Sequence, residues 1–364
     1  MEQVKDTAKV TDKLLYDALE LLKQLIATPS FSKTEDRTAD IIENFLRRNQ
    51  IPPGRFLNNV WAKNKYFDEG KPVILLNSHH DTVKPNAGYA LDPFDPKEAD
   101  GKLFGLGSND AGGALVALIA AFVYFYGKED LPFNLIIAAT AEEEISGHNG
   151  IEILLPQLPS IACGIVGEPT SLKMAVAEKG LLVLDCIAHG MAGHAARNEG
   201  VNAIYKAITD INWFQNFSFQ RASPFLGPVH MAVTSIHTKN TAHNVVPSEC
   251  SFVVDIRVNE LYTFEEVISE IRKHVTSEVA PRSTRLRPSF IKEEHPLVIA
   301  GKHLGLESYG SPTCSDRALM NFPTLKLGPG DSARSHSADE YIFTEEIKEG
   351  IEWYVQLLQN LKFE

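Results

Sequence analysis

The chain has 364 residues, of which 44% are hydrophobic and 23% are charged, so it is long and apolar enough for two or three folded domains, and a disordered or fibrous chain is excluded. Its formal net charge of −12 opposes binding to nucleic acids and to anionic membranes, and we predict neither as a partner. Four cysteines stand singly, without a Cys-x-x-Cys pair, which excludes a disulfide framework or a thiolate zinc finger and favours a reducing compartment.

The first residues show no secretory signal, and the apolar stretch 111–126 is shorter than the roughly 20 residues that span a bilayer. We therefore expect a cytoplasmic protein in which residues 111–126 form a buried helix. Hydrophobic spacing predicts two further helices, over residues 11–26 and 34–48. Four apolar runs indicate buried strands, at residues 72–77, 133–140, 162–167 and 324–328. Helical stretches between some of these strands favour an α/β fold with a mostly parallel sheet.

The segment from about residue 181 to 290 has a different pattern. We predict a strand over 181–190, a helix over 202–213, strands over 230–236 and 250–258, a helix over 263–278 and a last strand over 284–290. Thr263 and Glu266 form a capping box at the start of the second helix. This β-α-β-β-α-β order is ferredoxin-like. Because the fourth apolar run follows the segment, we predict that residues 181–291 form a small domain inserted into a larger one, made of residues 1–180 and 292–364.

Acids and histidines follow every predicted strand of the larger domain. They are His79, His80 and Asp81 after the first strand, Glu142, Glu143 and Glu144 after the second, Glu168 after the third, and Asp331 and His336 after the fourth, with Asp110 in the turn before the buried helix. Ligands bind at the carboxyl ends of strands in open α/β sheets, so we expect these side chains to share one site. So many acids in one crevice require cations, and mixed imidazole and carboxylate ligands suit zinc, cobalt or manganese. The ligands outnumber the four positions of one tetrahedral zinc, which favours two ions that share a carboxylate.

The spacing also suggests individual roles. His79 and Asp81 are two residues apart and would face the same side of an extended segment, so Asp81 is placed to orient the His79 ring. His80 would face the other way and pack in the core. Within the run Glu142 to Glu144, one carboxylate could bind metal while its neighbour accepts a proton from the attacking water; a solvated charge run is the alternative.

Other classes of function fit less well. The stretch LFGLGSNDAGG has Asp110 where a dinucleotide-binding fingerprint requires glycine, and neither a phosphate-binding loop nor the G-x-S-x-G of serine hydrolases occurs. A non-catalytic metal-binding protein is the alternative to an enzyme, although it would have no use for a free base such as Glu143.

Five motifs carry a resemblance to a known family. LNSHHDTV, GLGSNDAGG, TAEEEISG, VGEPT and GPGDSARSH occur in the order seen in the dinuclear-zinc aminoacylase/carboxypeptidase family, which includes acetylornithine deacetylase and succinyl-diaminopimelate desuccinylase. The resemblance covers nearly the whole chain. It implies an α/β catalytic domain with an inserted ferredoxin-like lid and dimerisation domain, two zinc or cobalt ions per chain, and a homodimer.

The resemblance also implies roles for single residues. His79 and Glu168 would bind one ion, Glu144 and His336 the other, and Asp110 would bridge them. Asp81 would orient His79, and Glu143 would be the general base. In the inserted domain, His194 resembles a histidine that reaches the active site of a partner subunit. Asn244 and Arg257 resemble substrate-binding residues, with a turn asparagine and a strand-surface arginine as the alternatives.

The implied activity is hydrolysis of an N-acyl amino acid, as in acetylornithine deacetylase of arginine biosynthesis. Desuccinylation, deacylation of an acylated citrulline or lysine, and dipeptide cleavage are the alternatives. The sequence departs from the family at several motif positions, among them Ser78 in place of glycine and Glu142 in place of aspartate. None of these departures removes an expected ligand or the expected base.

Overall fold

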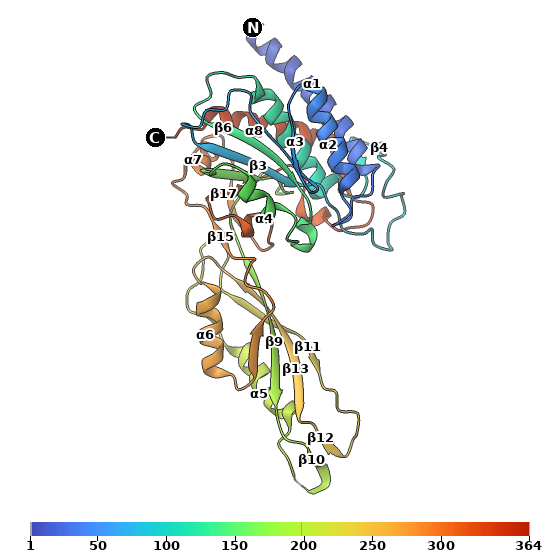
Figure 1. Ribbon diagram of the computed structural model, residues 1–364, viewed down its shortest axis with the longest axis vertical. Helices are drawn as coiled ribbons and strands as arrows, with labels where there is room; N and C mark the ends of the chain where they lie inside the picture. The colour runs from blue at the N-terminus through green and yellow to red at the C-terminus, as the bar shows by residue number, and fades with distance from the viewer. Residues whose placement is uncertain (1, 198, 364) are drawn as a thin grey trace. The chain divides into compact units, whose positions relative to one another are not determined.

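The protein is described by a computed structural model that covers residues 2–197 and 199–363. The chain separates into two compact units, coloured by position along the chain in Figure 1. The first contains the residues up to Val176, Ile291–Tyr309 and the residues from Ser315 onward, and the second contains Ala177–Phe290 and Gly310–Cys314. The domain boundaries given above stay a prediction.

A large mixed sheet organises the first unit, in the order β1-β2-β6-β3-β7-β17-β8. Its strands are β1 (Gly54–Phe56), β2 (Asn59–Lys63), β3 (Val73–His79), β6 (Asn134–Thr140), β7 (Cys163–Val166), β8 (Met174–Glu178) and β17 (Thr324–Lys326), with β15 (Ser289–Phe290) and β16 (Ser308–Ser311) pairing with β8. β3 runs parallel to β6 and β7, and β17 runs parallel to β7. Every residue of β3, β6 and β7 is buried, which explains why these strands read as continuous apolar runs. The predicted α/β fold with a mostly parallel centre is confirmed.

Helices enclose this sheet. They are α1 (Glu2–Ile26), α2 (Asp36–Arg48), α3 (Gly113–Tyr126), α4 (Ile151–Leu154), α7 (Pro296–His303) and α8 (Thr344–Asn360). The apolar α3 packs against both α1 and α8. The stretch Ser108–Tyr126 is apolar enough to cross a membrane by composition, but 83% of its most apolar window is buried inside the protein. It is therefore placed like the core helix of a folded domain, as the sequence predicted. A small sheet of β4 (Glu98–Ala99), β5 (Lys102–Phe104) and β18 (Tyr341–Phe343) lies in the same unit.

The second unit has the predicted β-α-β-β-α-β order. It consists of β9 (Gly180–His189), α5 (Ala203–Asn216), β11 (His230–His237), β13 (Glu249–Val258), α6 (Phe264–His274) and β14 (Glu278–Pro281), with the short strands β10 (Gly193–His194) and β12 (Val245–Val246) as an additional pair. Four of these strands form an antiparallel sheet in the order β11-β13-β9-β14. Burial alternates along β9 and β13, so one face of the sheet builds the core with α5 and α6. The capping box of Thr263 and Glu266 is present.

Two predictions in the second unit are wrong. The last helix ends at His274 rather than at residue 278, because Val275 is already extended and the Asp210 carboxylate accepts the amide N–H groups of Thr276 and Ser277. The fourth strand of the sheet is then residues 278–281, where the buried Val279 pairs with β9. Within residues 284–290 only the two residues of β15 form a strand, and they pair with β8 instead. Helix α6 thus ends just before the segment that binds the Asp210 carboxylate, which belongs to α5 and is far away in sequence.

Candidate metal centre

Two imidazoles and four carboxylates gather at the carboxyl ends of the parallel strands. Each comes from a segment that leaves the central sheet or from a turn next to it: His79 ends β3, Glu143 and Glu144 follow β6, Glu168 follows β7, His336 lies in the segment after β17, and Asp110 lies in the turn before α3. Parallel strands end at one edge of a sheet, so residues far apart in sequence meet there. The structure thereby brings together all five predicted metal ligands and the predicted base.

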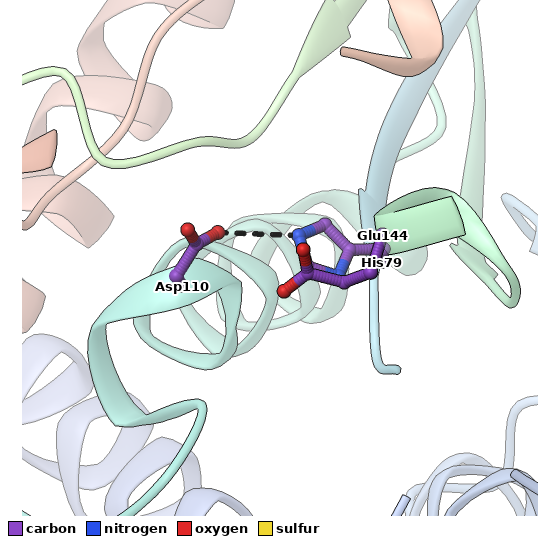
Figure 2. A group of neighbouring side chains, drawn as sticks. All are labelled: His79, Asp110 and Glu144. Atoms are coloured by element: carbon purple, nitrogen blue, oxygen red, sulfur yellow. Dashed lines mark hydrogen bonds and ion pairs between the residues drawn. The ribbon is translucent and has the colours of Figure 1, made fainter. Parts of the chain in front are cut away.

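Asp110 lies between the two imidazoles. Its Oδ1 atom is 3.3 Å from His79 Nε2, and its Oδ2 atom is 3.7 Å from His336 Nε2. Figure 2 shows the Asp110 side chain directed at His79 from the turn before α3, with Glu144 beside the ring. His336 Nε2 is in turn 3.0 Å from Glu144 Oε2. A carboxylate with one oxygen toward each imidazole is suited to bridge two cations.

Two overlapping groups of side chains could hold metal ions. In each group one ligand atom per residue lies within 4.8 Å of the others; the groups are His79 with Asp110 and Glu144, and His79 with Glu143 and Glu168. His79 Nε2 is 3.9 Å from an oxygen of Glu143 and 3.9 Å from an oxygen of Glu168. Nitrogen and oxygen donors without a thiolate, some of them buried, fit a divalent transition metal such as zinc or cobalt.

The electrostatics of the cluster also fit cations. Burial raises the pKa of Glu143 well above its ordinary value, and nearby Glu168 adds to the increase. The hydrogen bond to Glu144 raises the pKa of His336 to about 9. Burial lowers the pKa of His79, but hydrogen bonds with Asp110 and Asp81 raise it well above the usual value overall. Burial of Glu143 and the hydrogen bonds of the two imidazoles with the acids thus favour the protonated forms, and a divalent cation that bound here would compete with those protons.

Asp81 supports the cluster in a way that its spacing did not predict. His79 Nδ1 is 2.9 Å from the main-chain oxygen of Asp81 and 3.5 Å from its carboxylate. The carboxylate itself accepts the amide N–H groups of Glu143, at 3.0 Å, and Glu144, at 3.2 Å, and the hydroxyl of Ser32, at 2.7 Å. The main chain of Asp81 thus contacts the His79 ring, and its carboxylate binds the turn that carries the predicted base; its role in orienting the ring stays a prediction.

His80 and Asp331 take no part in the cluster. His80 is buried and its ring nitrogens lie 2.9 Å from the Thr38 hydroxyl and 2.9 Å from the main-chain oxygen of Asn58, so it is the packing residue that the alternation predicted. The Asp331 carboxylate accepts the amide N–H of Ala333, at 2.9 Å, and caps a turn.

Sequence reasoning gave no role to two buried acids beside the cluster. Asp316 accepts hydrogen bonds from the Asn77 amide, at 2.9 Å, and the Thr140 hydroxyl, at 2.7 Å, and burial raises its pKa to about 6. Glu340 accepts main-chain N–H groups of the turn that contains Asp110. Neither follows a predicted strand directly, and neither lies at a spacing typical of metal ligands, so only the fold identifies them.

The three predicted residues of the inserted domain belong to the second unit. His194 and Asn244 are exposed and close together, because β10 pairs with β12 and the amide of Ala195 donates to the main-chain oxygen of Asn244. Arg257 lies on β13 and pairs with Asp255, with Nε 2.8 Å from a carboxylate oxygen. The roles of these three residues stay predictions.

Comparison with known proteins gives a consistent result. Residues 75–360 match the sequence pattern of the peptidase family M20/M25/M40. The chain is 29% identical to a succinyl-diaminopimelate desuccinylase of Wolbachia pipientis, over 94% of this chain and 93% of that protein. It is 30% identical to an acetylornithine deacetylase of Erwinia tasmaniensis, over 91% of this chain and 94% of that protein.

Solved structures share the fold. The aminopeptidase PepT of Bacillus cereus matches with a TM-score of 0.75 and 17% identity, over 96% of this chain and 98% of that chain. The YXEP protein of Bacillus subtilis, a dinuclear metal-binding peptidase of the M20 family, matches with a TM-score of 0.73 and 15% identity, over 95% and 98%. The resemblance inferred from the five motifs is thereby confirmed. This chain is a metal-dependent amidohydrolase, and it belongs to the peptidase family M20/M25/M40.

Proposed function

We propose that this enzyme removes the acyl group from an N-acyl amino acid, in the manner of acetylornithine deacetylase. The observation that carries the proposal is Glu143, a half-buried carboxylate with a raised pKa that lies 3.9 Å from His79 at the edge of the metal cluster. A carboxylate in such a place is suited to proton transfer. The names of two relatives, acetylornithine deacetylase and succinyl-diaminopimelate desuccinylase, support an N-acyl amino acid as the substrate class and leave both acetyl and succinyl groups as candidates.

The side chains divide into ligands and a base. His79 and Glu168 would hold one ion, Glu144 and His336 the other, and Asp110 would contribute an oxygen to each. When bound, two divalent ions, zinc or cobalt, polarise the amide carbonyl and make water a stronger acid. Glu143 accepts a proton from the attacking water as its oxygen bonds to the carbonyl carbon. Glu143 then returns the proton to the amine nitrogen as the C–N bond breaks, so the products are a free acid and a free amino acid.

A panel of N-acyl amino acids tests the proposal. Zinc-loaded protein should hydrolyse at least one acetylated or succinylated amino acid with release of a free amine, and an added chelator should abolish the reaction. N-acetylornithine is the expected best substrate, and N-succinyl-diaminopimelate, N-acetylcitrulline, N-acetyllysine and a set of dipeptides form the rest of the panel. Cleavage of dipeptides alone would identify the enzyme as a peptidase and contradict the proposal. Hydrolysis that continued in fully chelated protein would contradict the roles of the ligands.

We also propose that the chain works as a homodimer in the cytoplasm. Apolar side chains are exposed on the second unit: Ile236, on the edge strand β11, is 52% exposed, and Tyr205 of α5 is 71% exposed. An exposed edge strand with apolar neighbours is suited to pair with the same strand of a second copy. Cys163, Cys186 and Cys250 are free thiols buried in the protein, which is consistent with a reducing compartment.

In this dimer, His194 would serve the active site of the partner subunit. His194 is exposed and ends the short strand β10. The residue before it is Gly193, where an added Cβ would come within 2.4 Å of the main-chain oxygen of Glu199. Such tight packing fixes the path of the main chain next to His194. A second copy would use the imidazole to stabilise the negative charge that develops on the carbonyl oxygen.

A mixed dimer distinguishes action in the partner's site from action in the same chain. Glu143→Ala and His194→Ala chains, each nearly inactive, are unfolded and refolded together. Random pairing makes half of the dimers mixed, and each mixed dimer has one intact site of two, so about a quarter of the wild-type activity should return. If His194 served its own chain, every site would keep one defect. Mixed dimers that were shown to be present but inactive would therefore rule out action across the dimer.

A further inference from the structure

Glu340 is a buried carboxylate directly behind the turn that carries Asp110. Only 2% of its surface is exposed, and both of its oxygens accept hydrogen bonds from main-chain amides. Oε1 accepts the N–H groups of Asn109 and Asp110, both at 2.9 Å, and Oε2 accepts the N–H of Gly107, at 3.1 Å. The main-chain oxygen of Glu340 also accepts the N–H of Gly105, at 2.9 Å. Four amides of one turn thus bind a single residue.

These amides need such a partner because the turn lies outside the hydrogen-bonded part of α3, which begins at Gly113. Buried main-chain N–H groups without an acceptor are costly, and a carboxylate is a strong acceptor for several of them. The turn has little freedom to adopt another path. Gly107 has φ of 76°, and a Cβ there would come within 2.5 Å of the Thr82 side chain.

The segment that contains Glu340 also carries His336. Asn109 ties the two segments together a second time, since its side chain donates to the main-chain oxygen of Asp331 and accepts the N–H of Asp331, both at 3.0 Å. Residues 331–340 therefore carry His336, one imidazole of the cluster. Through Glu340 and Asp331 the same segment also fixes the turn of Asp110, whose carboxylate lies between the two imidazoles.

We propose that Glu340 is a positioning residue of the metal centre: it fixes the main chain at Asp110 so that one carboxylate oxygen is directed toward His79 and the other toward His336. Glu340 is not itself a ligand, because its two oxygens are already engaged by the amides of the turn. The inference rests on the proposed dinuclear centre and adds a residue to it that no spacing or motif predicted. Such supporting residues typically change metal affinity or activity 10–100-fold when replaced.

The test compares zinc affinity in Glu340→Gln with that in a matched control. Glutamine keeps the shape of the side chain, but it brings an NH₂ group to face one of the three N–H donors and removes the charge. The control is Asp339→Asn, at the neighbouring acid, whose Oδ1 accepts the N–H groups of Ala90, at 2.9 Å, and Leu91, at 2.8 Å, away from the cluster. Asparagine keeps that acceptor and tolerates the φ of 51° at this position.

Zinc dissociation constants are measured by competition with a chromophoric chelator, and the melting temperature of each metal-free variant is recorded. We expect Glu340→Gln to weaken zinc binding about 10–100-fold, while Asp339→Asn stays close to wild type. Glu340→Asp, which keeps the charge but reaches less far, should also weaken binding, and it carries the test if the glutamine variant does not fold. Wild-type affinity in both Glu340 variants, or an equal loss in Asp339→Asn, would overturn the inference. A wild-type protein that bound no zinc would instead overturn the proposed function.

Discussion

Replacement of Glu143 by glutamine should lower kcat by about 10²–10⁴-fold or more, because general acid–base catalysis alone accounts for about that factor and this side chain would act in both proton transfers. Glutamine has nearly the same volume but cannot accept the proton of the attacking water. The bound metal should remain, since His79 and Glu168 would hold one ion and Glu144 and His336 the other. The measurement is kcat together with metal content by elemental analysis.

A nearby acid provides the control for this prediction. Glu152 lies on α4 and pairs with His148, at 2.9 Å, outside the cluster. Glu152→Gln removes one negative charge from the same region and should leave both kcat and metal content close to wild type. If Glu143→Gln lost its metal, Glu143 would be a ligand and the division of roles between Glu143 and Glu144 would be wrong.

Replacement of Asp110 by alanine should abolish activity for a different reason, namely loss of metal. Asp110 has one carboxylate oxygen near each imidazole, so its removal takes a ligand from both ions at once. Without Asp110, the carboxylates of Glu143, Glu144 and Glu168 also have no ligand beside them that could be shared by two cations. We expect the variant to bind zinc much more weakly at both positions, with activity returning only partly at high zinc concentration. Retention of two tightly bound ions in Asp110→Ala would contradict the bridging role.

The place of the site could be predicted from the sequence because the pattern of the buried strands is strong. β3, β6 and β7 are buried along their whole length and mostly apolar, so the acids and histidines at the carboxyl end of each one mark the edge of the sheet. His79, Glu143 and Glu168 were found in this way. Spacing alone did not show which carboxylate bridges the two ions and which acts as the base. The resemblance carried by the five motifs implied these two roles.

The support behind the site could not be predicted, because it consists of contacts with the main chain. Asp81 binds the amides of Glu143 and Glu144, and Glu340 binds those of the turn at Asp110, and amides are the same at every residue. No pattern of residue types marks such partners. The end of α6 was mistaken for a similar reason, since the Asp210 carboxylate that binds the amides of Thr276 and Ser277 comes from another helix.

Titration of metal-free protein with zinc tests whether the cluster around Asp110 holds two ions and whether hydrolysis depends on both of them. Binding is followed by calorimetry, and hydrolysis of the best N-acyl amino acid is measured at each point. We expect two zinc ions per chain, activity that rises as they bind, and better recovery with zinc or cobalt than with magnesium, because imidazole suits the softer ions. Full activity before any zinc is added, or no zinc binding at all, would show that hydrolysis does not depend on this cluster as a metal centre.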